Sequence, residues 1–197
     1  MLDHKHLTHK DIMKKLSEKV LYEGAWLTLK EAVYINKKGE TFKWEFIERK
    51  SSPHTVAIIA KLIPSQRFIL IKQFRPAINN YVIGFPAGVL PDYNNIDHAL
   101  VELKEETGYT GEIVSVSPEF KTTTGIMDSS SRVVMAKIDE NDPLNISPEQ
   151  DLEPEEDIEV ILLKEADIKS FLLAEQKKGT AIGSGPWSVF CNKDFIE

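Results

Sequence analysis

The sequence predicts an α/β fold, an α/β/α sandwich with a mixed sheet, plus a small β appendage at the N-terminus. Two observations support this prediction. Apolar runs of strand length recur along the chain among segments of helical periodicity, and two further β patterns precede them. With 197 residues and 42% hydrophobic content, the chain can bury one full core and carry a smaller appendage. We expect the appendage in residues 1–50 and the main domain in residues 51–197.

The expected elements follow in chain order. A polar helical lead over about residues 9–18 runs into β patterns at 19–35 and 41–49, with Asn36-Lys-Lys-Gly39 as the turn between them. Further strands are expected at 55–63, 67–74, 80–84, 111–117, 131–138 and 158–163. Besides the helix discussed next, helices are expected near 165–177 and 186–195, the second with Pro186 in its first turn.

The segment between Asp97 and Gly108 predicts a helix. Asp97 suits the N-cap, Ala99, Leu100 and Leu103 form an apolar stripe, and Gly108 suits the left-handed C-cap position.

Three carboxylates, Glu102, Glu105 and Glu106, lie on one face of this helix because they are three and four residues apart. Like charges at such spacings repel, and a divalent cation between them would offset the repulsion. Carboxylate oxygens suit Mg²⁺ or Mn²⁺, whereas Zn²⁺ would normally recruit His or Cys, for which His98 is the one nearby candidate. The alternative interpretation is a solvated acidic face.

The segment Gly88–Gly108 resembles the Nudix box, G-x5-E-x7-R-E-U-x-E-E-x-G-U, where U is apolar. Its C-terminal half matches at these positions: Glu102, Leu103, Glu105, Glu106, Gly108 and Tyr109. The front half departs, because the pattern spaces its glycines by 21 positions and here they are 20 apart. The first glutamate falls near Asn94 or Asn95, and Val101 replaces the arginine, so the pair that braces the metal-binding glutamate in this family is absent.

Motifs upstream resemble the ADP-ribose pyrophosphatase (ADP-sugar diphosphatase) branch of the Nudix superfamily. They are Tyr22–Trp26, Lys43–Arg49, Ile71–Pro76 and Gly84–Gly88. The resemblance implies the Nudix fold and a homodimer that exchanges its N-terminal strands. It also implies site residues: Trp26 and Trp44 to sandwich the adenine, Arg49 and Arg75 to hold the diphosphate and terminal ribose, and the Ala87 carbonyl with Glu102, Glu105 and Glu106 to bind metal.

Two of these residues have structural alternatives. Trp44 belongs to a period-two pattern with Phe42 and Phe46, which is typical of the core face of a strand. Arg75 ends an apolar run before Pro76 and would also suit a solvated edge.

The catalytic base is expected in the acidic loop at residues 148–157. Glu156 aligns best with the family and Glu155 is second, while a solvated loop is the alternative. Two departures from the branch are Thr124, where a proline is expected, and Gly84, where relatives can carry a glutamate near the metals.

Composition limits the partners. A net charge of −7 argues against a nucleic acid polymer but allows a small nucleotide. No apolar run reaches membrane-span length and no secretory signal is evident, so we expect no membrane partner and a cytoplasmic location, with which the single cysteine agrees. His4, His6 and His9 are interpreted as a solvated terminus.

The leading hypothesis is a Mg²⁺-dependent hydrolase, with Mn²⁺ as a possible substitute, that cleaves the diphosphate of ADP-ribose or a related ADP-sugar to AMP and a sugar phosphate. One rival is a Nudix-fold protein that binds a nucleotide without hydrolysing it. Another is a hydrolase of a different nucleoside diphosphate derivative, since stacking on tryptophan tolerates every base.

Overall fold

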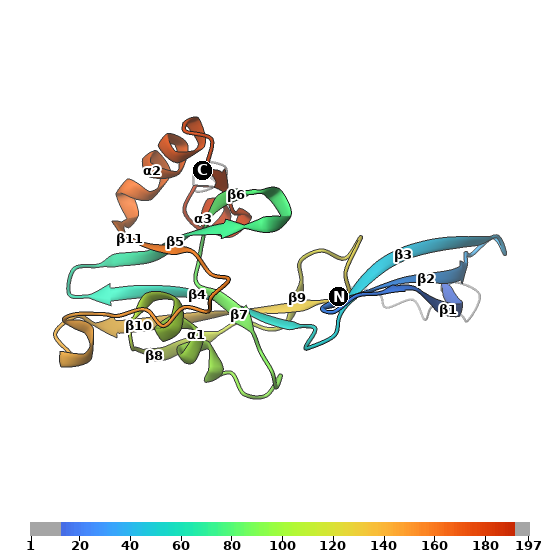
Figure 1. The fold of residues 1–197 in the computed structure, drawn as a ribbon, viewed down its shortest axis with the longest axis horizontal. Helices are drawn as coiled ribbons and strands as arrows, with labels where there is room; N and C mark the ends of the chain where they lie inside the picture. The colour runs from blue at the N-terminus through green and yellow to red at the C-terminus, as the bar shows by residue number, and fades with distance from the viewer. Residues whose placement is uncertain (1–12, 192–197) are drawn as a thin grey trace, which may run out of the picture. The chain divides into compact units, whose positions relative to one another are not determined.

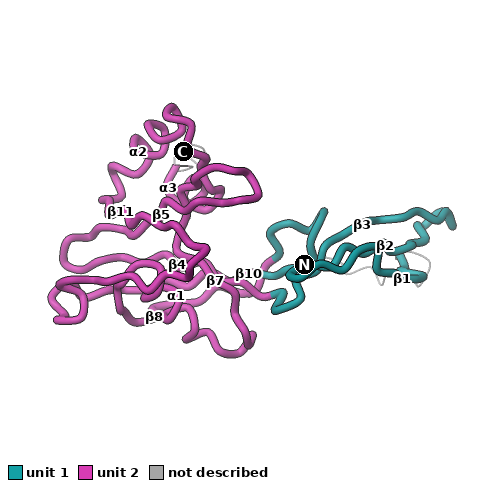
Figure 2. Tube along the Cα trace, viewed as in Figure 1, with its two compact units in different colours: residues 1–53, 121–130 teal, residues 54–120, 131–197 magenta. Residues whose placement is uncertain are grey.

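The computed structural model describes residues 13–191, which form two compact units (Figures 1 and 2). Of the described residues, the first unit contains 13–53 together with Lys121–Ser130, and the second contains His54–Phe120 and 131–191. None of the described helices is long and apolar enough to cross a membrane.

The first unit is built on a three-stranded antiparallel sheet in the order β1-β2-β3. Its strands are β1 (Lys14–Glu23), β2 (Leu27–Ile35) and β3 (Thr41–Arg49). The turn between β2 and β3 forms as expected, because the Asn36 side-chain carbonyl accepts backbone N–H bonds from Lys38 and Glu40, and Gly39 takes a φ of 84°.

The expected helical lead is wrong for residues 14–18, which lie in β1; residues 9–12 are outside the described chain. Pairing with β2 overrides the polar local pattern, and cross-strand ion pairs support it, including Lys30 with Glu18 at 2.9 Å. The expected run 19–35 is two strands, separated by a turn at residues 24–26.

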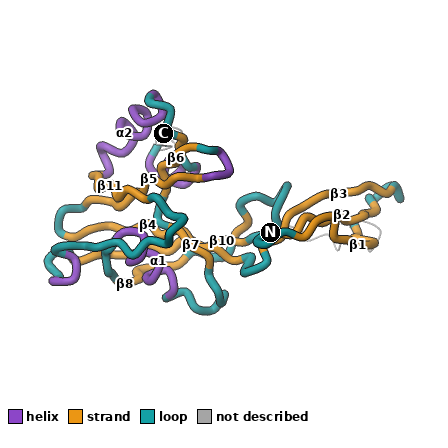
Figure 3. Tube along the Cα trace, in the orientation of Figure 1, coloured by secondary structure: helices purple, strands orange, loops and turns teal. Residues whose placement is uncertain are grey.

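The larger sheet is mixed and has the order β12-β6-β5-β4-β10-β8, with β11 also pairing β5 and β7 pairing β4. Figure 3 shows the strands of both units in orange and the helices in purple. Strand β12 runs parallel to β6, whereas the pairs β4–β5, β4–β7, β5–β6, β5–β11 and β8–β10 are antiparallel. Its strands are β4 (His54–Ile63), β5 (Arg67–Arg75), β6 (Asn80–Gly84), β7 (Ala87–Val89), β8 (Glu112–Val116), β9 (Phe120–Lys121), β10 (Ser130–Asp139), β11 (Ile158–Lys164) and β12 (Ala181–Ile182). The helices are α1 (His98–Thr107), α2 (Glu165–Lys177) and α3 (Ser184–Phe190), with 3-10 turns η2 (Pro76–Ile78) and η3 (Pro143–Asn145).

Two hydrophobic clusters lie on opposite faces of this sheet because successive strand residues point to opposite sides. On β4, Ile58 packs into the cluster that contains Leu103 of α1, and the next residue, Ile59, packs into the cluster that contains Leu172 of α2 and Phe190 of α3. The second unit is therefore an α/β/α sandwich, which confirms the predicted fold class (Figure 1).

Most expected elements of this unit are present within a residue or two, while β7, β9 and β12 were not anticipated. The last helix begins two residues earlier than expected and ends at Phe190; the expected residues 192–195 lie outside the described chain. Asp97 precedes α1 as predicted, but its side chain makes no capping hydrogen bond, because its backbone is already helical.

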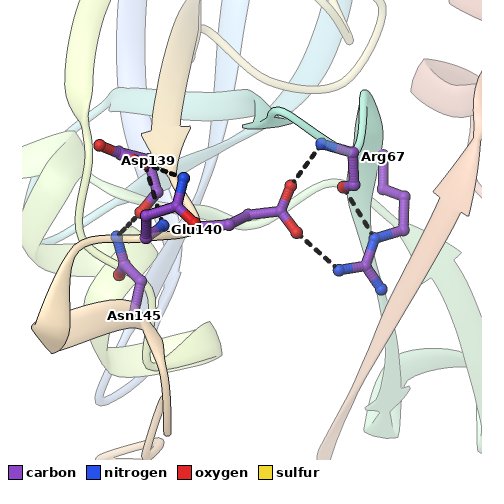
Figure 4. Close-up of polar contacts among 6 residues, drawn as sticks. Arg67, Asp139, Glu140 and Asn145 are labelled. Atoms are coloured by element: carbon purple, nitrogen blue, oxygen red, sulfur yellow. Dashed lines mark hydrogen bonds and ion pairs between the residues drawn. The ribbon is translucent and has the colours of Figure 1, made fainter.

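Two ion-pair networks tie the sheet to its surroundings. Glu140, after β10, accepts bonds from the Ser65 N–H and from Arg67 Nη2 at 2.7 and 2.8 Å (Figure 4). The Ser65 side chain, and after it Arg67 and the Ser65 N–H, lower the pKa of the Glu140 carboxyl. On the other side, Lys72 of β5 lies 2.9 Å from the buried carboxylate of Glu175 on α2.

Candidate active site

A cavity of about 480 Å³ in the second unit gathers most of the predicted site residues. It is lined by Gln73, Arg75, Ala87, Gly88, Val89, His98, Glu102, Glu105, Glu106, Asp151, Glu153 and Glu156. Six of these were predicted to act in the site: Arg75, Ala87, Glu102, Glu105, Glu106 and Glu156. Glu155, the second candidate for the base, is exposed and does not line the cavity.

Helix α1 positions the three glutamates. Ala99 and Leu103 bury its apolar face, and Gly108 ends the helix in the left-handed conformation, with φ 78° and its N–H bonded to the Lys104 carbonyl. Val101, where the Nudix pattern has arginine, is 44% exposed and points away from the buried face.

The loop between β7 and α1 closes through local turns. The Asn95 N–H bonds the Asp92 carbonyl at 3.1 Å, and the Asp92 side chain accepts the Asn94 N–H at 2.9 Å. Tyr93 anchors the loop, with its ring centroid 4.8 Å from that of His54 and 4.0 Å from the Arg132 Cζ. The loop thus forms without the two charged residues that the Nudix pattern places here.

Glu106 is the most buried of the three glutamates, with 2% exposure. Burial raises the pKa of its carboxyl from 4.5 to about 8, with further increases from Glu156 and Glu102. The Ala87 N–H, 2.9 Å from Oε2, and Arg75 oppose this rise. Without an added cation, burial therefore favours the protonated form of this carboxyl.

Glu102 packs against the backbone of β7. A Cβ atom at Gly88 would lie 1.9 Å from the Glu102 Cδ, so the carboxylate fills the space that any side chain at this position would need. Burial raises the pKa of Glu102, while His98, with Nε2 3.4 Å from Oε1, lowers it. The glycine therefore fixes where this carboxylate can lie.

The acidic loop is fastened to the end of α1. Gln150 donates from Nε2 to the Glu106 carbonyl at 2.6 Å and to the Ile158 carbonyl at 3.1 Å, and the Asp151 N–H bonds the Glu105 carbonyl at 2.9 Å. These bonds hold the loop that carries Glu156 beside the glutamates.

Two further contacts fix the loop. At its far end, the Phe74 N–H bonds the Asp157 carbonyl at 3.0 Å, and the Tyr81 hydroxyl donates to the Asp157 carboxylate. At its near end, a Cβ at Gly108 would lie 2.5 Å from the backbone nitrogen of Glu149. Gly108 is therefore required both by its φ and by this close approach.

The donors that line the cavity suit a divalent cation, since most of them are carboxylates, and among the described residues the buried Glu106 has no cationic partner within ion-pair distance. Among residues 13–191, no three acidic, histidine or cysteine side chains are already gathered at metal-binding distances. The donor chemistry therefore fits a metal ion, and the carboxylates would have to converge on it when it binds.

The other three predicted residues belong to the first unit. Trp44 is 50% exposed and lines a hollow of about 580 Å³ with Tyr34, Phe42 and Phe46, and its Nε1 donates to the Gly125 carbonyl at 3.1 Å. The alternative interpretation of Trp44 as a core-facing residue is therefore wrong.

Trp26 lies in the turn between β1 and β2, where it is 82% exposed and lines a separate hollow of about 380 Å³. Arg49 is exposed at the end of β3, paired with Leu27 in the sheet.

Sequence reasoning missed several cavity residues. Gln73 lies within the recognised Ile71–Pro76 motif and so had a local signal, while His98 was named as a nearby candidate for Zn²⁺ but not among the predicted site residues. Asp151 and Glu153 had no signal beyond the charge of their loop.

Comparison with known proteins finds clear relatives, although no protein-family model matches the chain. The chain is 33% identical over 160 residues to an ADP-sugar pyrophosphatase of Mus musculus, and the aligned region covers 77% of this chain and 73% of that protein. It is 32% identical over 168 residues to an uncharacterized Nudix hydrolase of Schizosaccharomyces pombe, with 81% and 82% covered. It is 34% identical over 143 residues to an ADP-ribose pyrophosphatase of Saccharomyces cerevisiae, with 68% and 62% covered.

A solved structure described as an ADP compounds hydrolase superposes with a TM-score of 0.63 at 18% identity, covering 89% of this chain and 97% of that one. At this identity the likeness supports the fold.

Proposed function

Because this chain belongs to the Nudix hydrolase family, in the branch of ADP-ribose and ADP-sugar pyrophosphatases, we propose that it hydrolyses the diphosphate bond of ADP-ribose or a related ADP-sugar. Water would add across the bond to give AMP and a sugar phosphate. The observation that carries this proposal is the cavity where Glu102, Glu105 and Glu106 meet Arg75 and Glu156.

A divalent cation, Mg²⁺ or alternatively Mn²⁺, would be held by the three glutamates and the Ala87 carbonyl. When bound, it supplies positive charge that neutralises the diphosphate and lowers the pKa of the attacking water. The buried position of Glu106 supports this role, since its raised pKa reflects a carboxylate without enough compensating charge.

Glu156 would orient or deprotonate the attacking water. It is half-buried and lines the cavity, whereas its neighbour Glu155 is exposed outside it, which favours Glu156 over the alternative base.

Arg75 would bind phosphate oxygens from the cavity edge, with Arg49 as its partner in the clamp. Trp26 and Trp44 would stack the base, because each presents a largely exposed ring.

We also propose a homodimer that shares the base-binding site between subunits through the N-terminal strands. Within one chain Trp26 and Trp44 line separate hollows, so a sandwich of one base needs rings from two copies. Strand β1 supports this, because it lies at an edge of its sheet and exposes Val20 and Tyr22. The single cysteine, the buried Cys191, agrees with a cytoplasmic location.

A second candidate function is nucleotide binding without hydrolysis. The shortened loop before α1 and the exposed Val101 favour it, because the metal-binding glutamates then lack the arginine that braces them in the Nudix pattern. A third keeps the chemistry and changes the substrate to another nucleoside diphosphate derivative.

The test is to incubate the purified protein with ADP-ribose and Mg²⁺, with and without a chelator, and to measure AMP and ribose 5-phosphate by chromatography. Chelator-sensitive AMP establishes the hydrolase. Binding of ADP-ribose without product supports the nucleotide-binding protein. If neither binding nor product is detected, other nucleotides are tested.

A matched pair of variants tests the base. Glu156→Gln should lower kcat by about 10²-fold or more, while Glu155→Gln should change it little. Equal losses in both variants would contradict the assignment of Glu156.

A further inference from the structure

His98 stands apart from the other residues of the cavity because it brings a nitrogen donor to a set of carboxylates. We propose that His98 is a ligand of the metal ion and that it gives the site a preference for a first-row transition metal ion, such as Co²⁺ or Zn²⁺, over Mg²⁺. This inference rests on the proposed function, because it concerns the same metal site.

The spacing of His98 and Glu102 suits joint ligation. Residues four apart on a helix project from the same face, and this is the spacing at which two side chains of one helix bind a single ion. The His98 Nε2 lies 3.4 Å from Glu102 Oε1. Two ligands bonded at about 2.0–2.2 Å to one ion lie about 3–3.5 Å apart, so the pair is already near that separation.

The surroundings of the pair hold it in place. Glu102 packs against the backbone at Gly88, which limits its carboxylate on the side of β7. Both side chains are mostly shielded, with 27% and 19% exposure. Among the described residues, no other basic side chain is within ion-pair distance of Glu102, Glu105 or Glu106.

The chemistry of the donor decides the metal. Mg²⁺ prefers oxygen ligands and keeps its waters, whereas imidazole favours the later first-row ions. An imidazole in the ligand set should therefore raise the affinity for Co²⁺ or Zn²⁺ and leave the affinity for Mg²⁺ nearly unchanged.

The chain has five histidines, which allows a clean test. In the parent variant His4, His6, His9 and His54 are replaced by Gln, so that His98 is the only histidine. The matched variant carries His98→Gln in addition, which keeps an amide able to bond Glu102 but removes the imidazole. Co²⁺ affinity is measured by equilibrium dialysis, and Mg²⁺ affinity by its competition with Co²⁺. Proton NMR of the Co²⁺-loaded protein records exchangeable imidazole N–H signals shifted by the ion.

We expect the parent to show a shifted, exchangeable imidazole signal that is absent after His98→Gln. Co²⁺ affinity should fall by about tenfold or more, at least the loss seen for residues that only support a ligand, and Mg²⁺ affinity by less than about threefold. If replacing His54, which stacks on Tyr93, prevents folding, the same comparison is made with His54 retained, because it does not line the cavity.

The inference is overturned if the parent binds Co²⁺ without the imidazole signal, or if His98→Gln lowers the Co²⁺ and Mg²⁺ affinities equally. Chelator-sensitive hydrolysis of ADP-ribose in the same protein would then show that the proposed function stands and that only the role of His98 is refuted. If the parent binds neither ion and makes no AMP, the metal site and the inference both fail.

Discussion

Replacing Glu106 by Gln should separate catalysis from stability. Glu106 is almost fully buried, and its pKa in the folded, metal-free protein is about 8 instead of 4.5. Gln keeps the shape and can still accept the Ala87 N–H through its side-chain carbonyl, but it has no proton to lose.

The sign of the effect follows from the direction of the pKa shift. Because the folded-state pKa is raised, the stability associated with Glu106 is fully present below pH 4.5 and is lost as the pH rises through about 8. The loss at pH 8 has an upper limit of about 4 kcal/mol, and less than about 1 kcal/mol is lost at pH 5. We expect the metal-free Glu106→Gln variant to be more stable than the unmodified protein by about 2 kcal/mol at pH 8, or about 4–8 °C in Tm.

The assay is urea and thermal unfolding at pH 5 and pH 8, in chelator and in saturating Mg²⁺, with ADP-ribose hydrolysis measured on the same samples. At pH 8 Mg²⁺ should stabilise the unmodified protein but not the variant, whose turnover should be nearly abolished. A stability difference that is the same at pH 5 and pH 8, or full activity in the variant, would refute the reasoning.

Three more outcomes are expected. Gly88→Ala should lower kcat on ADP-ribose by about tenfold or more with an unchanged circular dichroism spectrum, because its Cβ displaces the Glu102 carboxylate; unchanged kcat would contradict this. Lys72→Met should lower the free energy of urea unfolding by about 3 kcal/mol, since it leaves the buried Glu175 with the Thr180 hydroxyl and with the largely exposed Lys178 as its remaining cation, whereas Lys178→Met should cost much less. Contacts with Lys178 and Lys72 lower the pKa of Glu175 to about 2, so stability should decline as the pH falls from about 4.5 toward 2, and a flat acid profile would exclude this contribution.

Long periodic segments made most of the fold predictable. The strands β4, β5, β6 and β10 and the helices α1 and α2 each carry enough residues for a pattern of burial to emerge. The first half of β1, residues 14–18, could not be recognised from its own residues, because the whole strand is exposed and the pairing with β2 holds it extended. The two-residue strands β9 and β12 are too short to show any period.

The glutamates were predictable because their relation is local, within two turns of one helix. Other parts of the site depend on contacts between distant residues. The Gln150 side chain reaches the Glu106 carbonyl across 44 positions, and no sequence pattern indicates that contact. The first unit also depends on a contact between distant residues. The segment Lys121–Ser130 belongs to it through bonds such as that from the Ile47 N–H to the Ile126 carbonyl.

The two loops that border the glutamates differ in their tolerance of insertions and deletions. The segment between β7 and α1 is closed by its own turns around Asp92, so a residue can be lost there without moving either neighbouring element. The acidic loop is bonded to α1 at one end and to β5 and β6 at the other, which fixes the length of chain between Glu149 and Ile158. The missing residue of the Nudix pattern therefore falls in a loop that closes by its own turns, outside both β7 and α1.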